Sequence, residues 1–243
     1  MGFLRWAQSW SGRWRVIATK VRPFAAYRYI RGHGIEIGAL NDPLQTFHGA
    51  KVRYVDRLPT DKLRVAYPEI AGQPLVALDQ VDDGEKLASI ADASCDFVIA
   101  NHVIEHVRNP IGAIENMFRV LKLSGILYLA LPDKRFTFDA ARAVTSYEHL
   151  KRDYLESPEW SEAEHYLDWI TSVGKVTDAS EAERRAKQIE AAAGDIHFHV
   201  WTQREFIELV LNLRRDFHWP IEIEAVLKNG QEFVVVLRKT DLG

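Results

Sequence analysis

Residues 95–132 read CDFVIANHVIEHVRNPIGAIENMFRVLKLSGILYLALP and predict a strand, a helix and a second strand in succession. The runs 95–101 and 125–132 are almost wholly apolar, as strands covered on both faces are. Between them, Asn109 can cap a helix and Pro110 suits its first turn. The apolar face of that helix comprises Ile111, Ile114, Met117, Phe118 and Leu121. Two parallel strands joined by a helix are the building unit of a doubly wound α/β sheet.

Further strand signals lie on both sides of this unit. Three precede it, at 34–38 (GIEIG), 51–56 (KVRYVD) and 74–79 (PLVALD). Two follow it, at 221–228 and 232–239, and the Asn229-Gly230 pair between them is a strong hairpin signal. We therefore expect an α/β fold with an open, Rossmann-like sheet, mostly parallel, that carries an antiparallel hairpin at its C-terminal edge.

The segment 139–195 interrupts the alternation of strands and helices. It is polar and helical in character, with Trp and Tyr residues interspersed, and it suits a helical insertion that forms a lid over a site. Those aromatic residues either pack the core of the insertion or stack on a sugar or aromatic ring. After it, Thr202 and Glu205 predict a capping box and another helix. The length favours one domain, 25–243, preceded by a separate segment, 1–24.

Residues 3–22 have the periodicity of an amphipathic helix, which we expect Pro23 to end. Apolar residues recur three or four positions apart and form one stripe, made of Phe3, Trp6, Trp10, Trp14, Ile17 and Val21. Residues 1–32 carry seven Lys and Arg and no Asp or Glu. This pattern suits a helix lying on an anionic membrane surface. It also suits a leading helix packed on the sheet with its basic face in solvent.

Composition excludes several classes of protein. With 47% hydrophobic and 27% charged residues the chain can bury a core, and its net charge of −3 argues against broad nucleic-acid binding. The single cysteine, Cys95, can form neither an intramolecular disulfide nor a thiolate zinc site, which fits a reducing compartment. The sequence has no apolar run of about 18 residues and no recognisable signal peptide. We expect a cytoplasmic protein, peripheral at the inner face of the membrane if residues 3–22 bind there.

Polar and small residues follow the predicted strands, where open α/β sheets bind their ligands. These are Gly38, Ala39, Asp56, Arg57, Asp82, Asp83, Asn101 and His102. On position alone, Asp56 is either a ribose-binding carboxylate or a solvated turn aspartate. Asp82 and Asp83 either receive an adenine amino group or form an Asp-Asp-Gly turn.

Four segments resemble the class I S-adenosylmethionine-dependent methyltransferases: GIEIG, YVD, SCDFVIANHVIEHV and MFRVLKLSGILYLALPD. The resemblance covers residues 33–135, and the segment HFHVWTQREF shows a weaker similarity. It is greatest for the ubiquinone-type O-methyltransferases. It implies a seven-stranded sheet, a methyl-transfer activity and S-adenosylmethionine as the methyl donor. By resemblance, the cofactor residues are Glu36 and Gly38 in the first loop, Asp56 at the ribose, Asp82 or Asp83 at the adenine, and Asn101 and His102 beside the methyl donor.

One departure from the family pattern follows Gly38, where further glycines are usual. This chain has the run 39–43 (ALNDP) instead. A methyltransferase binds no pyrophosphate, so its loop needs a less close backbone approach than a dinucleotide site does. The missing glycines therefore weaken the case for cofactor binding and strongly disfavour a nicotinamide enzyme. They leave a catalytically silent, methyltransferase-like binding or scaffold protein as the alternative.

Histidines supply the candidates on the acceptor side, because an alcohol acceptor benefits from a base with a pKa near 7. We expect His102 to act as a base or to orient the acceptor, and His199 to be ordered over the site by the lid. His106 suits a structural hydrogen bond at least as well as catalysis. His197 and His199 can share one face with Asp195, but no clear further ligand is present, so we expect no metal site.

The run PDKRFTFD and the insertion resemble bacterial methyltransferases that modify cell-surface glycans and lipid-linked sugars. Such an acceptor presents a hydroxyl, and its product is a methyl ether. We therefore expect O-methylation of a small molecule, a sugar or a lipid-linked glycan. The other expected partner is an anionic membrane surface, bound through residues 3–22, and we expect no nucleic acid.

Overall fold

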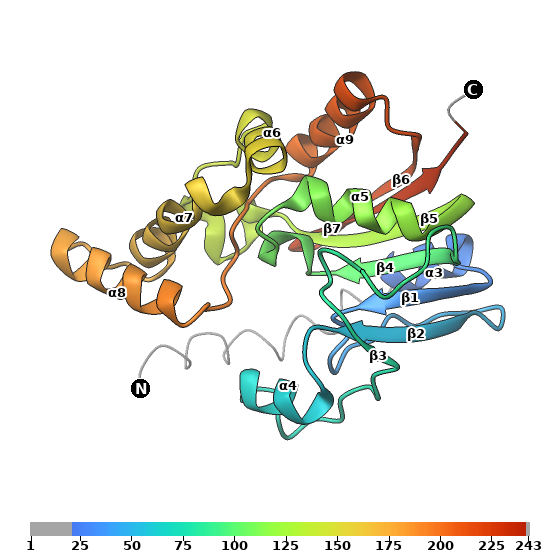
Figure 1. Cartoon of the computed structure of the whole chain (residues 1–243), viewed down its shortest axis with the longest axis horizontal. Helices are drawn as coiled ribbons and strands as arrows, with labels where there is room; N and C mark the ends of the chain where they lie inside the picture. The colour runs from blue at the N-terminus through green and yellow to red at the C-terminus, as the bar shows by residue number, and fades with distance from the viewer. Residues whose placement is uncertain (1–20, 242–243) are drawn as a thin grey trace.

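A seven-stranded mixed sheet forms the centre of the computed structural model, which describes residues 21–241 (Figure 1). Its strands are β1 (His33–Ile37), β2 (Lys51–Asp56), β3 (Gln80–Val81), β4 (Cys95–Asn101), β5 (Leu121–Pro132), β6 (Ile221–Asn229) and β7 (Glu232–Lys239). They lie in the order β3-β2-β1-β4-β5-β7-β6. Neighbours from β3 to β5 are parallel, whereas β7 is antiparallel to β5 and β6. The predicted Rossmann-like architecture is confirmed.

Helices cover both faces of the sheet and extend beyond one end of it (Figure 1). They are α3 (Val21–Tyr29), α4 (Thr60–Ala66), α5 (Pro110–Val120), α6 (Tyr147–Glu156), α7 (Glu162–Asp168), α8 (Ala179–Ala191) and α9 (Gln203–Phe217). Shorter helical turns are η1 (Ile104–His106), η2 (Lys134–Phe136), η3 (Phe138–Ala141), η4 (Pro158–Trp160) and η5 (Trp169–Val173). In Figure 1, α6, α7 and α8 lie beyond the end toward which β1 and β4 point. The insertion therefore lies at the carboxyl edge of the parallel strands.

The side chains of β4 alternate between two cores, because successive residues of a strand point to opposite faces. Val98 and Ala100 belong to the core that includes α5 and α9, and Phe97 and Ile99 belong to the core that includes α3. All four side chains are fully buried. Burial of a side chain as large as Ile99 or Phe97 stabilises a fold by roughly 1.5–3 kcal/mol. The apolar run in the sequence thus reflects cover on both faces.

Both predicted helix starts are confirmed. The side chain of Asn109 accepts a hydrogen bond of 2.9 Å from the amide of Gly112 at the start of α5. Thr202 and Glu205 form a capping box at the start of α9. These contacts satisfy amide groups that have no partner within the helix.

The insertion is helical, as predicted, and has a core of its own. Residues of α7, η5, α8 and the segment before α9 form that core, namely Tyr166, Ile170, Ala182, Ala186, Ile196 and Phe198. At least one aromatic residue of the insertion, Tyr166, is therefore a packing residue.

The prediction of a strand at 74–79 was wrong. β3 comprises only Gln80 and Val81, which pair with Val55 and Asp56 of β2. Residues 74–79 are exposed or partly exposed, so burial does not hold them in a sheet.

Two turns also differ from the prediction. The hairpin turn consists of Gly230 and Gln231, because Asn229 already pairs with Glu232 across the two strands. Gly230 has φ +65°, a conformation that favours glycine. Pro23 lies in the first turn of α3 and does not end a helix. Proline is tolerated in a first turn because an N–H group there has no partner within the helix.

The predicted amphipathic helix, residues 3–22, lies outside the described residues except for positions 21 and 22. Among residues 21–241, no helix is long and apolar enough to cross a bilayer.

Candidate active site

Glu36, at the end of β1, is a buried carboxyl group at the carboxyl edge of the sheet. It is 1% exposed and accepts hydrogen bonds from the Leu44 amide at 2.9 Å and from Asn101 Nδ2 at 3.4 Å. Burial raises the pKa of Glu36 to about 7, and the hydrogen bond from Leu44 offsets only part of this effect. An acidic side chain with such a pKa stands close to the midpoint of its titration at neutral pH.

The loop after Glu36 forms a tight turn although it has a single glycine. Gly38 has φ +66° and donates its amide to the Val55 carbonyl at 3.0 Å. Leu40 has φ +48°, the left-handed conformation that glycine adopts most easily, and Ala39 between them is buried. A left-handed residue other than glycine costs roughly 1–2 kcal/mol, so the surroundings hold Leu40 in place. The run 39–43 thus makes this turn without the additional glycines.

Asp56 and Asp82 lie side by side after β2 and β3. The amide of Asp82 donates to the Asp56 carbonyl at 3.0 Å. The Asp56 carboxylate is 7% exposed and accepts from the Arg57 amide at 2.7 Å; burial raises its pKa. Asp82 accepts from the amides of Asp83 and Ser89, both at 2.8 Å. These contacts give Asp82 the role of a turn-capping residue.

Asp83 and Arg57, two other predicted cofactor residues, have partners of their own. Asp83 is exposed, and its carboxylate pairs with Lys86 at 3.3 Å. Arg57 donates to the Tyr67 hydroxyl at 3.2 Å. The structure thus brings Glu36, Gly38, Asp56, Asp82 and Asn101 to the same edge of the sheet, while Asp83 points to Lys86.

His102, directly after β4, is held between two carboxylates. Its Nδ1 lies 3.2 Å from Glu105 Oε1, and its Nε2 lies 2.6 Å from Glu232 Oε2. Glu232 begins β7 and also accepts two hydrogen bonds from Arg22 of α3. Burial disfavours a charge on His102, but Glu105 and Glu232 outweigh it and raise its pKa to about 9. His102 is therefore an imidazolium at neutral pH, which suits orientation of an acceptor better than removal of its proton.

His106 and Asp195 form a histidine–aspartate pair near His102. His106 Nδ1 donates to Asp195 Oδ1 at 2.7 Å, and Asp195 also accepts from the Tyr67 hydroxyl at 2.8 Å. Arg57 adds an ion pair to Asp195 at 3.6 Å. Burial opposes the charge of Asp195, but these partners outweigh it and lower its pKa to about 2. Burial opposes a charge on His106, but Asp195 and Glu105 outweigh it and raise the pKa of His106. Once the ring is neutral, a carboxylate on Nδ1 fixes its tautomer and leaves Nε2 for proton transfer.

A second histidine–aspartate pair lies beside the first. His197 Nδ1 donates to Asp139 Oδ2 at 2.7 Å, and Arg142 pairs with Asp139 at 3.0 Å. The rings of His106 and His197 meet edge to face, with centroids 4.7 Å apart. Imidazole groups therefore meet where the insertion joins the sheet edge.

The placement of His199 does not support the predicted catalytic role. Its side chain is fully buried, and its Nε2 lies 3.1 Å from the Arg108 carbonyl oxygen. Burial, with His165 nearby, lowers its pKa well below the usual value, so the ring is neutral. The metal set considered from the sequence is not brought together either, since Asp195 pairs with His106 and His197 pairs with Asp139.

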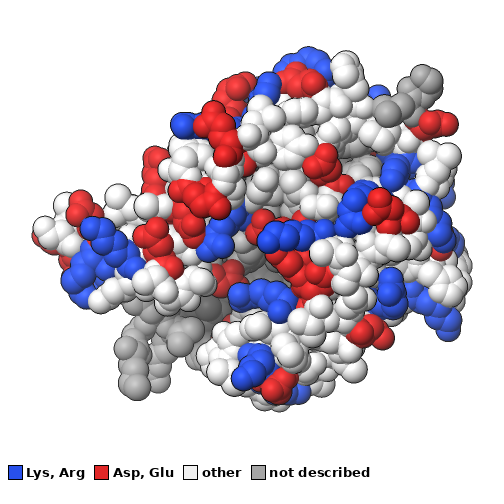
Figure 2. All heavy atoms as spheres, in the orientation of Figure 1, with Lys and Arg blue, Asp and Glu red and all other residues white. Residues whose placement is uncertain are grey.

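Charged side chains gather on this face of the molecule. Figure 2 shows acidic and basic atoms side by side in a hollow near its centre, where Figure 1 has the ends of β1 and β4. This edge of the sheet is thus rich in charge, as expected for a polar ligand.

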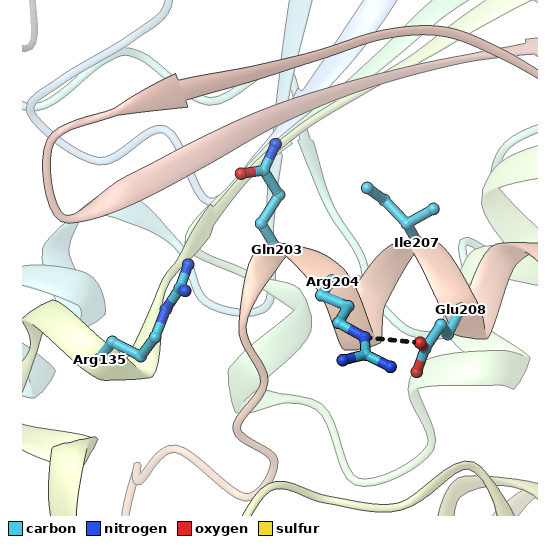
Figure 3. Close-up of a pocket in the computed structure, with 5 residues that line it drawn as sticks. All are labelled: Arg135, Gln203, Arg204, Ile207 and Glu208. Carbon is cyan, nitrogen blue, oxygen red and sulfur yellow. Dashed lines mark hydrogen bonds and ion pairs between the residues drawn. The ribbon is translucent and has the colours of Figure 1, made fainter.

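A different hollow, of about 430 Å³, lies on the outer side of α9 (Figure 3). It is lined by Arg135, Gln203, Arg204, Ile207 and Glu208. Arg204 and Glu208, one turn apart on α9, pair with each other at 2.8 Å. None of its lining residues is a candidate cofactor residue, so it is separate from the strand-end site.

The sequence does not reveal the roles of three residues around His102: Glu105 and Glu232 contact it, and Arg22 pairs with Glu232. Glu232 is 130 positions from His102, so no local motif connects them. A signal was present nevertheless. An antiparallel strand begins where its parallel neighbours end, so the first residue of the predicted last strand belongs at the carboxyl edge.

Residues 34–129 match a family model described as a methyltransferase domain. No curated protein matches the sequence.

Among solved structures, one from Rhodobacter sphaeroides that is named for zinc-dependent alcohol dehydrogenases is 13% identical with a TM-score of 0.50, covering 96% of this chain and 94% of that one. A Thermotoga maritima protein, named as a methyltransferase and possible histamine N-methyltransferase, is 16% identical with a TM-score of 0.49, covering 97% of both chains. A Methanosarcina mazei methyltransferase is 17% identical with a TM-score of 0.47, covering 88% of this chain and 95% of that one. At these identities, a structural likeness bears on the fold alone.

Proposed function

We propose that this chain, an S-adenosylmethionine-dependent methyltransferase, methylates a hydroxyl group on a small molecule, a sugar or a lipid-linked glycan. The observation that carries the proposal is the His106–Asp195 pair beside the carboxyl edge of the sheet. A hydroxyl is a weak nucleophile, and it gains from a base that takes its proton as the new bond forms.

The residues at the strand ends fit a cationic methyl donor. Asn101 Oδ1 is buried and has no hydrogen-bond partner, and it neighbours the Glu36 carboxylate. Burial raises the pKa of both Glu36 and Asp56, because neither carboxyl group has enough positive charge around it to offset desolvation. S-adenosylmethionine supplies an electrophilic methyl group and carries positive charge on its sulfonium and ammonium groups. Glu36 and Asn101 would accept from the ammonium, and Asp56 would accept from the ribose hydroxyls.

His106 and His102 would have different roles toward the acceptor. The acceptor hydroxyl oxygen would form a bond to the methyl carbon while the carbon–sulfur bond breaks and its electron pair stays on sulfur. The hydroxyl proton would pass to Nε2 of His106, whose Nδ1–H is held by Asp195. The imidazolium of His102 would hold a second oxygen of the acceptor in place. Positioning of this kind supplies much of the rate of a one-step displacement.

A transfer assay with methyl-labelled S-adenosylmethionine tests the hydroxyl proposal. A panel of sugars, lipid-linked glycans, amines and carboxylic acids would be offered as acceptors. We expect label only in hydroxyl-bearing acceptors, in a product that survives alkali, because a methyl ether resists hydrolysis and a methyl ester does not. Label in an amine, or label released by alkali, would overturn the proposal.

A lipid-linked acceptor would agree with a membrane-binding N-terminal segment. We propose that residues 3–22 bind an anionic surface through their Trp stripe and basic residues. Pelleting with anionic liposomes, with and without residues 1–24, tests this. We expect the full chain to pellet and the shortened chain to stay in the supernatant, and equal binding by both would contradict the proposal.

The relation to the ubiquinone-type O-methyltransferases is likewise a proposal. It rests on the segments SCDFVIANHVIEHV and MFRVLKLSGILYLALPD, which form β4, η1, α5 and β5. Activity toward a phenol, added to the same acceptor panel, would support it.

A further inference from the structure

Three histidines and one aspartate form a buried cluster inside the insertion, apart from the residues assigned to methyl transfer. His149 and Asp153 lie one turn apart on α6, His165 lies on α7, and His199 lies in the segment before α9. Asp153 and His199 are fully buried, and His165 is 9% exposed. Three separate elements thus contribute side chains to one point.

The separations of their donor atoms match those around a tetrahedral metal ion. His149 Nε2 lies 3.0 Å from His165 Nε2 and 3.3 Å from Asp153 Oδ2. His199 Nε2 lies 3.8 Å from the same Asp153 oxygen. Because Nε2 also lies 3.1 Å from the Arg108 carbonyl oxygen, Nδ1 is the atom of His199 that is left for a metal. Zinc bonds of about 2.0–2.1 Å place neighbouring ligands of a tetrahedron about 3.3 Å apart. One donor atom from each of the four residues lies within 4.8 Å of all the others, so one ion can contact them together.

Two buried atoms of the cluster have no hydrogen-bond partner, Asp153 Oδ2 and His199 Nδ1. The other carboxylate oxygen, Asp153 Oδ1, accepts from the Ser161 hydroxyl at 3.0 Å. A buried polar atom without a partner costs free energy. A metal ligand typically binds the ion through one polar atom, while a hydrogen bond to its other polar atom holds the side chain in place.

The charges of the cluster also favour a cation. Within residues 21–241, no Lys or Arg forms an ion pair with Asp153. Neutral imidazoles are the form that binds metal, and a carboxylate without a cation gains most from one.

We propose that His149, Asp153, His165 and His199 bind one zinc ion in a closed, structural site. Three imidazoles and one carboxylate suit zinc, and four protein ligands leave no position for a substrate. The ion would join α6, α7 and the segment before α9. His197 lies two residues before His199 and contacts His106, so the ion would also hold the acceptor side of the active site in place.

This site revises the expectation that the chain has no metal site. The sequence-based set of Asp195, His197 and His199 shares only His199 with the cluster. The spacing of the four ligands, 4, 12 and 34 residues apart, matches no short metal-binding motif. Tertiary packing of α6, α7 and the segment before α9 brings them together.

The proposal is tested by metal analysis of the tag-free chain. We expect about one zinc per chain by mass spectrometry of the purified protein, and loss of that zinc in Asp153→Asn and in His165→Gln. His33→Gln is the matched control, because His33 is exposed at the amino end of β1, and it should keep its zinc. Equal zinc content in the control and the ligand variants would overturn the proposal.

A second measurement does not depend on the folding of variants. The wild-type chain would be stripped with a chelator and titrated with Co²⁺. We expect the intense visible absorption of tetrahedral Co²⁺, saturating at one ion per chain, and a higher melting temperature of the loaded chain. A weak spectrum of octahedral type, or no binding, would contradict the site. Neither readout involves methyl transfer, so failure of the zinc site leaves the proposed activity untouched.

Discussion

The pKa values of Glu36 and Asp56 at the sheet edge and of Asp195 beside the insertion are shifted in opposite directions. At the edge, burial raises the pKa of Glu36 to about 7 and also raises the pKa of Asp56. Beside the insertion, His106, Tyr67 and Arg57 overcome burial and lower the pKa of Asp195 to about 2. Glu36 and Asp56 accept hydrogen bonds from backbone amides, whereas Asp195 accepts one from His106 and forms an ion pair with Arg57. Glu36 and Asp56 therefore lack a positive charge that a cationic donor can bring, whereas Asp195 already has its partners.

The largest effect on activity should come from substitution of His106, the partner of Asp195. We expect His106→Asn to lower kcat about 10²- to 10⁴-fold, since it removes the group that takes the proton. Binding of S-adenosylhomocysteine should change little, because His106 belongs to the acceptor side. Steady-state kinetics and calorimetry on the same preparation separate the two, with His33→Gln as control. A large loss of affinity with unchanged kcat would place His106 in the donor site instead.

A smaller effect, on ligand affinity, is expected from substitution of Asp56 at the sheet edge. Asp56→Ala should weaken S-adenosylhomocysteine binding about 10- to 100-fold, the effect of losing hydrogen bonds to a charged group. The exposed Asp61 of α4 provides a control variant, Asp61→Ala. Calorimetry measures both. Equal affinities for the two variants would show that Asp56 does not contact the ligand.

The pH dependence of stability tests the charge on His102. Its pKa is raised to about 9, so its contribution is fully present below the unfolded value of about 6.5 and is lost as pH rises through 9. We expect the melting temperature of the wild type to fall between pH 6.5 and 9 relative to that of His102→Gln. Parallel curves for the two proteins over this range would mean that Glu105 and Glu232 do not hold an imidazolium.

The smallest effect belongs to the scaffold that both regions share. Asn109→Ala removes the cap of α5 and should cost about 1 kcal/mol, which is roughly 2–4 °C in melting temperature for a domain of this size. Thermal unfolding measures it, while affinity for S-adenosylhomocysteine should be unchanged. A loss of affinity would show that α5 also positions the cofactor loop.

The sheet edge was largely predictable from the sequence, because local patterns determine it. The buried run of β4 and the cap at Asn109 each predict one element, and the carboxyl edge collects the residues after each strand. The run 74–79 misled because apolar content alone does not show that a segment is buried.

The insertion side was predicted only in outline. Its helical character is visible in the sequence, but the partners of its histidines are set by tertiary packing. Asp195 lies 89 positions from His106, and Glu232 lies 130 from His102. No periodicity reports such pairs, so the charge of His102 and the burial of His199 became apparent only in the structure.

Calorimetric titration of the wild-type chain with S-adenosylhomocysteine tests most directly whether the carboxyl edge binds a methyl donor. We expect one molecule bound per chain, with tighter binding than that of Asp56→Ala. No detectable binding at millimolar ligand would contradict methyl transfer and favour a binding or scaffold protein with the same fold.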